Sequence, residues 1–219
     1  MTSKQLLKFI KNYLQYNKVV SEIFFKSTNL TLGYSNQVVL SNLNLELSEE
    51  NNYQIIGRNG AGKSTLINFI SSNFDGTDFD SEVIRTKSNV DQISPYATLI
   101  MELTFLENIK YFTTKSELSI DEKIAISKNY LPEIYLDEKV KNFSSGMIRR
   151  AELSIIEIKE PTILCIDEPL NFLDSEGINL LKNLIDKRTK NQKSNILSTQ
   201  ELIDFQGINF EVIDLNENE

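Results

Sequence analysis

The chain has 219 residues, of which 40% are hydrophobic and 25% are charged, a balance typical of a single globular domain. The formal net charge is −8, and a field of that sign repels phosphate backbones, so no nucleic-acid partner is predicted. The chain has no histidine, which excludes histidine-based catalytic triads and histidine-ligated metal sites.

The cysteine content and the apolar segments indicate the compartment. Cys165 is the single cysteine and lies in an apolar run, so we expect it to pack in a core rather than react or form a disulfide. No apolar stretch approaches the ~20 residues that a membrane span needs. Lysines interrupt the N-terminus, which does not resemble a signal peptide. A cytoplasmic location is therefore expected.

Residues 1–20 predict a basic amphipathic helix that precedes the main domain. At 100° per residue, four lysines share one face and several apolar side chains share another. The lysines are Lys4, Lys8, Lys11 and Lys18, and the apolar residues are Leu6, Leu7, Ile10, Tyr13 and Leu14. Two interpretations stay open: the apolar face packs on the domain, or the helix docks to a membrane surface or a partner.

Residues 21–219 are assigned to the main domain, which begins with short strands. Between residues 22 and 47, three apolar bursts separated by polar turns predict β-strands over Glu22–Phe25, Val38–Leu40 and Leu43–Leu47. Tyr53–Ile56 predicts a short buried strand, which leads into a glycine-rich loop and a helix over Ser64–Ile70.

The second half of the domain alternates between helices and strands. Residues 97–142 lack strand character and predict a small helical lobe. Thr162–Ile166 predicts a buried strand, leucines at helical spacing after it predict a helix, and Ser194–Thr199 predicts a further strand. This alternation indicates an α/β core with a mostly parallel sheet.

The glycine-rich loop matches the complete phosphate-binding motif G-x-x-x-x-G-K-[ST] between a predicted strand and a predicted helix. Glycines let successive backbone N–H groups converge on phosphate oxygens, and the helix N-terminus adds a favourable dipole. Lys63 is expected to reach the β- and γ-phosphates, and the Ser64 hydroxyl to ligate Mg²⁺. An ordinary glycine turn is the weaker alternative. The predicted nucleotide-binding residues here are Gly57, Arg58, Asn59, Gly60, Ala61, Gly62, Lys63, Ser64 and Thr65.

Two acidic residues, Asp167 and Glu168, follow the strand predicted over Thr162–Ile166. In an open α/β sheet, ligands bind at the carboxyl ends of the strands. Asp167 is therefore expected to hold Mg²⁺ through water, and Glu168 to act as the general base that activates the attacking water. Solvated acids at a strand end are the alternative, but the preceding phosphate-binding loop favours the catalytic interpretation.

Five further segments resemble the ABC ATPase family, in the family's order, so that the resemblance covers about residues 22–215. Tyr34 resembles the aromatic residue that stacks on adenine. Gln92 resembles the glutamine that touches Mg²⁺ and senses a transmembrane partner. Asn171–Asp174 resembles the D-loop, with Asp174 as its acidic residue, and Leu197–Glu201 aligns with the switch segment.

The fifth segment, Phe143–Met147, is similar to the family signature and closer still to the SSGM variant of some bacterial exporters. Ser-x-Gly at a helix start supplies a hydroxyl, exposed N–H groups and a dipole, all suited to a γ-phosphate. In the family this element acts in trans, because two domains pair head to tail. The residues assigned to that role are Ser144, Ser145, Gly146 and Met147.

The chain departs from the family at the switch segment, where Gln200 stands in place of histidine. A glutamine amide can donate one hydrogen bond to the γ-phosphate but cannot shuttle a proton. The catalytic assignments are Glu168, Gln200 and Lys63, with slow turnover expected. Either Gln200 is a working substitute, or the site is degenerate and a partner subunit carries the turnover. The signature also lacks its second glycine, at Ser145, and its glutamine, at Met147.

The resemblance implies a P-loop NTPase core with a mostly parallel sheet, an N-terminal antiparallel β-subdomain and a small helical subdomain. It implies ATP and Mg²⁺ as ligands and a second ABC ATPase domain, a copy or a paralogue, as partner. A separate transmembrane permease would hold the chain at the inner face of the cell membrane. The implied function is ATP-driven transport, with export favoured by the signature. The alternatives are a regulatory or degenerate ATP-binding subunit and a soluble, non-transport ABC protein.

Overall fold

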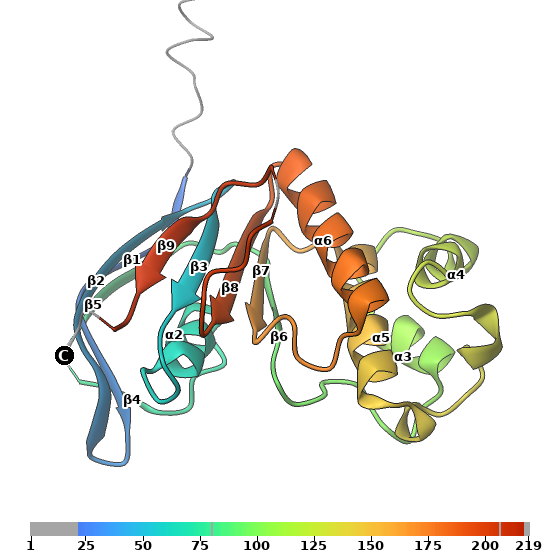
Figure 1. Ribbon diagram of the computed structural model, residues 1–219, viewed down its shortest axis with the longest axis horizontal. Coiled ribbons are helices and arrows are strands. Elements are labelled where there is room, and N and C mark those ends of the chain that lie inside the picture. The colour runs from blue at the N-terminus through green and yellow to red at the C-terminus, as the bar shows by residue number, and fades with distance from the viewer. Residues whose placement is uncertain (1–21, 80, 206, 217–219) are drawn as a thin grey trace, which may run out of the picture.

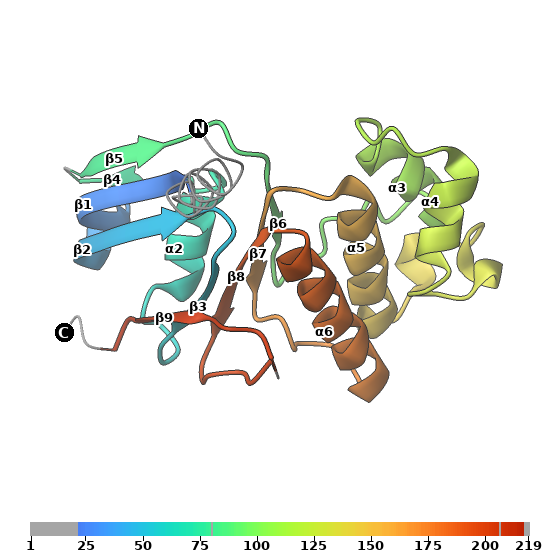
Figure 2. The ribbon, with the colours of Figure 1, turned by 90° about the horizontal axis from the view of Figure 1, so that it is seen from above.

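The computed structural model describes residues 22–79, 81–205 and 207–216. The amphipathic helix predicted over residues 1–20 lies outside the described residues. Viewed from above, the molecule has an antiparallel sheet at one end, a parallel sheet in the middle, and helices α3 and α4 at the other end (Figure 2).

The antiparallel sheet is built on two long strands that form a hairpin, with two short strands added later in the chain (Figure 1). Its strands are β1 (Ile23–Tyr34), β2 (Gln37–Ser48), β4 (Thr77–Asp78) and β5 (Glu82–Arg85). The antiparallel β-subdomain is thus confirmed, but the prediction of three short strands between residues 22 and 47 was wrong. Register shifts along the β1–β2 pair break the alternation of apolar residues, so the sequence pattern shows only fragments of each strand.

The central sheet is entirely parallel, with the order β6-β7-β8-β3-β9. Its strands are β3 (Asn52–Ile56), β6 (Val90–Ile93), β7 (Ile163–Asp167), β8 (Ser194–Thr199) and β9 (Glu211–Asp214). All residues of β7 and β8 are buried, as expected of strands that are covered on both faces. The strands predicted near residues 53, 162 and 194 are confirmed, and all three are largely buried.

Helices cover both faces of the parallel sheet. The helices of the described residues are α2 (Lys63–Ile70), α3 (Phe105–Phe112), α4 (Ile120–Ser127), α5 (Ser145–Lys159) and α6 (Ser175–Lys190), with 3₁₀ turns η1 (Glu133–Tyr135) and η2 (Val140–Asn142). Of these, α2, α5 and α6 cover the sheet. Helix α2 packs between the two sheets, whereas apolar residues of α5 and α6 pack against β7 and β8 on the other face.

The helical lobe forms where the sequence predicts helices. Helices α3 and α4 each begin with a capping box, in which Thr104 and Ser119 exchange hydrogen bonds with the third residue of the helix. Phe105 and Ile109 of α3 pack against α5, so the lobe shares its core with that helix. Because the parallel strands all run the same way, the ends of β3, β7 and β8 place their following loops at one edge of the sheet.

Candidate nucleotide-binding site

The loop between β3 and α2 has the geometry of a phosphate cradle. Gly60 and Gly62 adopt positive φ angles of 86° and 90°, a conformation that glycine reaches without strain. A Cβ atom on Gly62 would lie 2.6 Å from the Leu40 side chain, so that position also lacks space. No side chain caps the N-terminus of α2, and Ser64 is exposed there. The helix N-terminus is therefore open to an anion.

Lys63 lies folded across this loop rather than in solvent. Its Nζ donates hydrogen bonds to the backbone carbonyl oxygens of Gly57, at 2.7 Å, and of Arg58, at 3.1 Å. The side chain is buried. A buried ammonium group that is held by two neutral carbonyls can exchange them for phosphate oxygens, which carry full negative charge.

The two acidic residues after β7 lie in different environments. Asp167 is buried and accepts a hydrogen bond from the Ser198 hydroxyl of β8. Glu168 is partly exposed, and its φ of 51° is unusual for a residue that is not glycine. Its backbone N–H donates to the Ser198 carbonyl at 3.1 Å, which holds the strained turn in place. Ser198 therefore positions both acids.

One pocket, of about 220 Å³, joins the phosphate-binding loop to Glu168. Its lining residues are Val39, Asn59, Gly60, Gly62, Lys63, Ser64, Thr65 and Glu168. A second pocket, of about 440 Å³, lies against the same loop and shares Val39, Asn59 and Gly60 with the first. Strand β2 therefore supplies a wall that the motif alone does not indicate.

Three residues assigned to the site from the family resemblance do not line these pockets. The Tyr34 ring is partly exposed and packs edge-on against Phe74, with 5.4 Å between the ring centres. The Gln92 amide N–H donates a hydrogen bond to the Asn68 side chain at 2.7 Å. The Gln92 amide oxygen accepts from the side chains of Ser71 and Asn73 at the end of α2. Gln200 is exposed directly after β8. The nucleotide and metal roles of these three residues stay predictions.

The signature segment lies apart from the phosphate-binding pockets. Ser144 caps α5 by accepting a hydrogen bond from the Met147 backbone N–H at 3.3 Å, and Ser145 is exposed. A Cβ atom on Gly146 would lie 2.9 Å from the carbonyl oxygen of Phe172, so the signature contacts the D-loop of its own chain. No signature residue lines either pocket beside the phosphate-binding loop. The predicted helix start is confirmed, and the in trans role stays a prediction.

Asp174, the acidic residue of the D-loop, caps α6. Its carboxylate accepts from the Gly177 backbone N–H at 2.8 Å and from the Arg150 guanidinium of α5 at 2.6 Å. These donors lower the pKa of Asp174, with the Gly177 N–H as the largest cause. The D-loop is thereby joined to the signature helix by an ion pair.

Sequence reasoning missed Asn216, which supports the phosphate-binding loop from β9. Its Oδ1 atom accepts a hydrogen bond from the Arg58 backbone N–H at 3.0 Å, and its own N–H groups donate to Asp214. The Leu215 backbone N–H donates to the Ile56 carbonyl at 2.9 Å, just before the loop. No motif marks Asn216, because its role arises from the pairing of β9 with β3.

Comparisons with known proteins agree with this geometry. The family model described as ABC transporter matches residues 40–171. Lantibiotic transport ATP-binding protein SrtF of Streptococcus pyogenes is 32% identical in an alignment of 202 residues that covers 85% of this chain and 86% of that protein. Bacitracin transport ATP-binding protein BcrA of Bacillus licheniformis is 30% identical in an alignment of 207 residues that covers 84% of this chain and 65% of that protein.

Solved structures share the fold. The ATP-binding cassette MJ0796, described as dimeric in a post-hydrolysis state with ADP and Pi, matches with a TM-score of 0.68 and 23% identity, over 81% of this chain and 88% of that one. The family model spans more than half of the chain, and the two curated relatives span most of it. The chain therefore belongs to the ABC transporter family, as an ATP-binding subunit.

Proposed function

We propose that the chain hydrolyses ATP and that this hydrolysis drives export through a separate membrane subunit. The observation that carries the proposal is that Glu168 lines the same pocket as Lys63 and Ser64 of the phosphate-binding loop. Hydrolysis needs a base beside the γ-phosphate, because the attacking water must lose a proton as its oxygen bonds to phosphorus. A carboxylate next to the cradle supplies that base.

Each residue of the pocket has a distinct task in this proposal. Lys63 exchanges its backbone carbonyl partners for the β- and γ-phosphate oxygens. Glu168 accepts the proton of the attacking water, whose oxygen bonds to the γ-phosphorus while the bond to the β-phosphate oxygen breaks and ADP leaves with the electron pair. Ser64 and Asp167 offer the oxygen ligands that Mg²⁺ prefers, and the bound ion would neutralise phosphate charge.

Gln200 supports a second candidate, a subunit that binds ATP with little turnover. The chain has no histidine to donate to the γ-phosphate, and Gln200 is exposed after β8. Thr199 in front of it is bonded through its hydroxyl to the Glu201 carbonyl at 2.6 Å, which shapes a tight bend. An amide at this bend can donate one hydrogen bond, so we favour slow hydrolysis over none.

The experiment is a measurement of Mg-ATP turnover and ATP affinity by the wild type and three variants. Glu168→Gln is expected to bind ATP with unchanged affinity and to lose turnover. Gln200→Ala is expected to lower turnover by about 10²-fold, because one donor to the developing charge is lost. Gln200→His is expected to keep or raise turnover.

The opposite result would be clear. If the wild type shows no turnover, alone or with a membrane subunit, and Gln200→His restores none, the chain binds ATP without hydrolysing it. Lys63→Ala serves as the control for binding, since it removes the ammonium group from the cradle and is expected to abolish Mg-ATP affinity. Unchanged affinity in that variant would contradict nucleotide binding at this loop.

The transport part of the proposal rests on the family and on the names of relatives. SrtF and BcrA are named as lantibiotic and bacitracin transport ATP-binding proteins, and the SSGM-type signature favours export as the direction. None of the helices in the described part of the chain has the length and apolar composition to cross a bilayer, so we assign the membrane path to another subunit. Co-purification with a membrane protein encoded nearby would test this assignment, and its absence would favour a non-transport role.

A further inference from the structure

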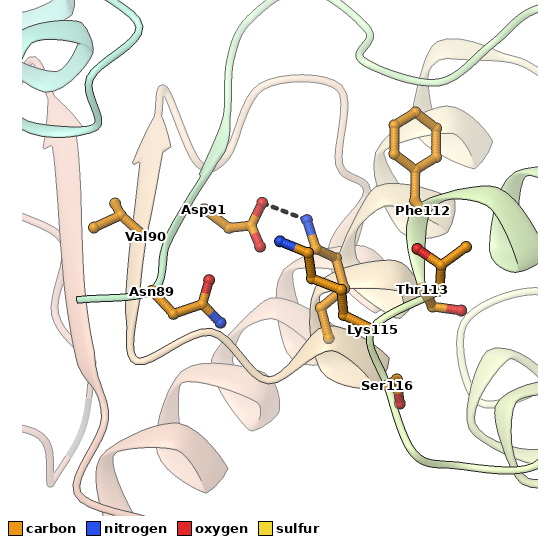
Figure 3. A pocket seen from close by; sticks show the side chains of 9 residues that line it. Asn89, Val90, Asp91, Phe112, Thr113, Lys115 and Ser116 are labelled. Carbon is orange, nitrogen blue, oxygen red and sulfur yellow. Dashed lines mark hydrogen bonds and ion pairs between the residues drawn. The ribbon is translucent and has the colours of Figure 1, made fainter. Parts of the chain in front are cut away.

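A polar pocket of about 340 Å³ lies between the helical lobe and the edge of the parallel sheet, away from the nucleotide loop. Its walls are the segment 112–116 after α3, the start of β6 at residues 89–91, and Lys159 at the end of α5. Figure 3 shows the side chains of Asp91 and Lys115, which come from two of these segments, pointing toward one another. None of these residues has a part in the nucleotide site described above.

The pocket contains two ammonium groups and one carboxylate. Lys159 pairs with Asp91 at 2.5 Å. The Lys115 side chain reaches toward the same carboxylate, beside the ammonium group that Asp91 binds (Figure 3). Within residues 22–79, 81–205 and 207–216, Lys115 has neither an ion pair nor a hydrogen-bond partner. One positive charge is therefore left uncompensated, in a chain whose net charge is −8.

Arg188 also interacts electrostatically with the Asp91 carboxylate. Burial lowers the pKa of the Arg188 guanidinium to about 10, and the carboxylates of Glu160 and Asp91 oppose that shift. Asp91 thus lies in the field of both Lys159 and Arg188. With one carboxylate against the ammonium groups of Lys159 and Lys115, the lining of the pocket carries a net positive charge.

The carbonyl groups at the end of α3 would repel an anion, but they are already bonded. The Nζ of Lys123, itself buried, donates to the carbonyl oxygens of Thr113, at 2.9 Å, and Ser116, at 3.4 Å. The Asn89 and Thr114 side chains make no hydrogen bond to other described residues, so an amide N–H and a hydroxyl remain able to donate to a ligand. Together with the Lys115 ammonium group, these donors suit a ligand that carries acceptor oxygens.

From this arrangement we infer a second ligand site, which binds a small organic phosphate monoester between the lobe and the sheet. Lysine is a common phosphate ligand because it is a compact point charge, and the hydroxyls and amide supply further donors. Phe112 forms an apolar part of the wall, and about 340 Å³ is within the range of small-molecule pockets, so the space suits a phosphate with an organic group. The occupant contacts both the lobe and the core.

The test is a titration of the full chain with phenyl phosphate, followed by backbone amide chemical shifts in NMR spectra. Phosphate also suits the nucleotide loop, so shifts at residues 57–64 are recorded separately from those at 89–91 and 113–116. Saturable shifts at 113–116 are expected. Lys115→Ala is expected to weaken them about tenfold, because one charged hydrogen bond is lost. Lys110→Ala is the matched control, since this exposed lysine of α3 does not line the pocket.

Three outcomes would overturn the inference. Shifts confined to residues 57–64 would show that only the nucleotide loop binds the phosphate. Equal affinity of Lys115→Ala and Lys110→Ala would remove the role of the unpaired ammonium group. Inorganic phosphate that binds at 113–116 as tightly as phenyl phosphate would exclude an organic ligand. None of these outcomes bears on ATP hydrolysis, which is tested independently through Glu168.

Discussion

At the scale of single residues, two glycines of the phosphate-binding loop distinguish the cost of backbone strain from the cost of steric crowding. Both adopt positive φ, but only Gly62 is crowded, because a Cβ atom there would lie 2.6 Å from the Leu40 side chain. A Cβ atom on Gly60 would have no neighbouring atom within 4 Å. We expect Gly60→Ala to lower the free energy of unfolding by about 1–2 kcal/mol through backbone strain. Gly62→Ala is expected to cost a further ~1–3 kcal/mol from overpacking.

Urea unfolding of the two variants measures this difference, and each variant serves as the control for the other. Equal losses of stability would mean that Leu40 moves aside at no cost, contrary to the close packing of the loop on β2. ATP affinity adds a second comparison, because the loop must keep its backbone N–H groups directed at phosphate oxygens.

Cys165 illustrates a residue whose chemistry is suppressed by its position. It is fully buried in β7, and burial raises the pKa of its thiol to about 12. The expectation that this cysteine packs rather than reacts agrees with that placement. We predict no reaction with a thiol reagent at about pH 8 in the native protein and full reaction in denaturant, because only the thiolate attacks. Fast modification of the native chain would show that β7 opens readily.

At the scale of elements, a buried ion pair within the signature helix α5 makes hydrogen bonds to the loop after β6. Arg149 of α5 donates to the Ser94 carbonyl at 3.1 Å and pairs with Glu152 at 3.2 Å. Glu152 in turn accepts from the Thr98 backbone N–H at 2.9 Å. Both side chains of the pair are almost fully buried. The loop at residues 94–98 is therefore held against α5.

Replacing one residue of this pair should cost more stability than replacing both residues. Glu152→Leu leaves the Arg149 charge buried without its partner, so we expect a loss of about 3–5 kcal/mol in the free energy of unfolding. The double variant Arg149→Met, Glu152→Leu is expected to be at least ~1 kcal/mol more stable than that single variant. Urea unfolding measures both, and a double variant that is the less stable would contradict the argument.

The pH dependence of stability provides an independent test of the same pair. Burial raises the pKa of Glu152 above its ordinary value of 4.5, although Thr98 and Arg149 oppose the shift. Between that value and the raised one, the native state binds more protons than the unfolded state. The Glu152 contribution to stability therefore falls as pH rises through this window. We predict that Glu152→Gln, which cannot titrate, removes this fall, whereas Glu133→Gln at an exposed position retains it.

How far the sequence predicts the elements depends on what each element is paired with. Strand β7 is buried on both faces and is identified by its continuous apolar run, whereas β8 is equally buried although only Ile196 and Leu197 of its residues are apolar. Strand β9 lies at the sheet edge, and β5 is a short strand with three exposed residues, so neither shows a clear pattern. The phosphate-binding motif is local and was predictable. Asn216 and Ser198 act through strand pairing, which no local pattern encodes.

At the scale of the whole molecule, the phosphate-binding loop and the signature lie in different parts of one chain. The phosphate-binding loop and Glu168 share a pocket at the ends of β3 and β7, whereas Ser144 and Gly146 begin α5 beside the D-loop. The signature caps its own helix and leaves Ser145 exposed. An exposed helix N-terminus with a hydroxyl is suited to phosphate, and we propose that this phosphate belongs to a nucleotide held by another molecule.

We therefore predict that two chains pair around ATP, with each signature placed on the nucleotide of the other. Glu168→Gln should retain ATP and accumulate as a dimer, because the base that ends the ATP state is missing. In that background, Ser145→Glu should block pairing by adding a negative charge where a γ-phosphate would bind, without lowering ATP affinity. Glu117→Gln, an exposed change outside both regions, is the control. Light scattering with and without ATP measures the outcome, and monomers in ATP, with a paralogous partner also present, would contradict the pairing.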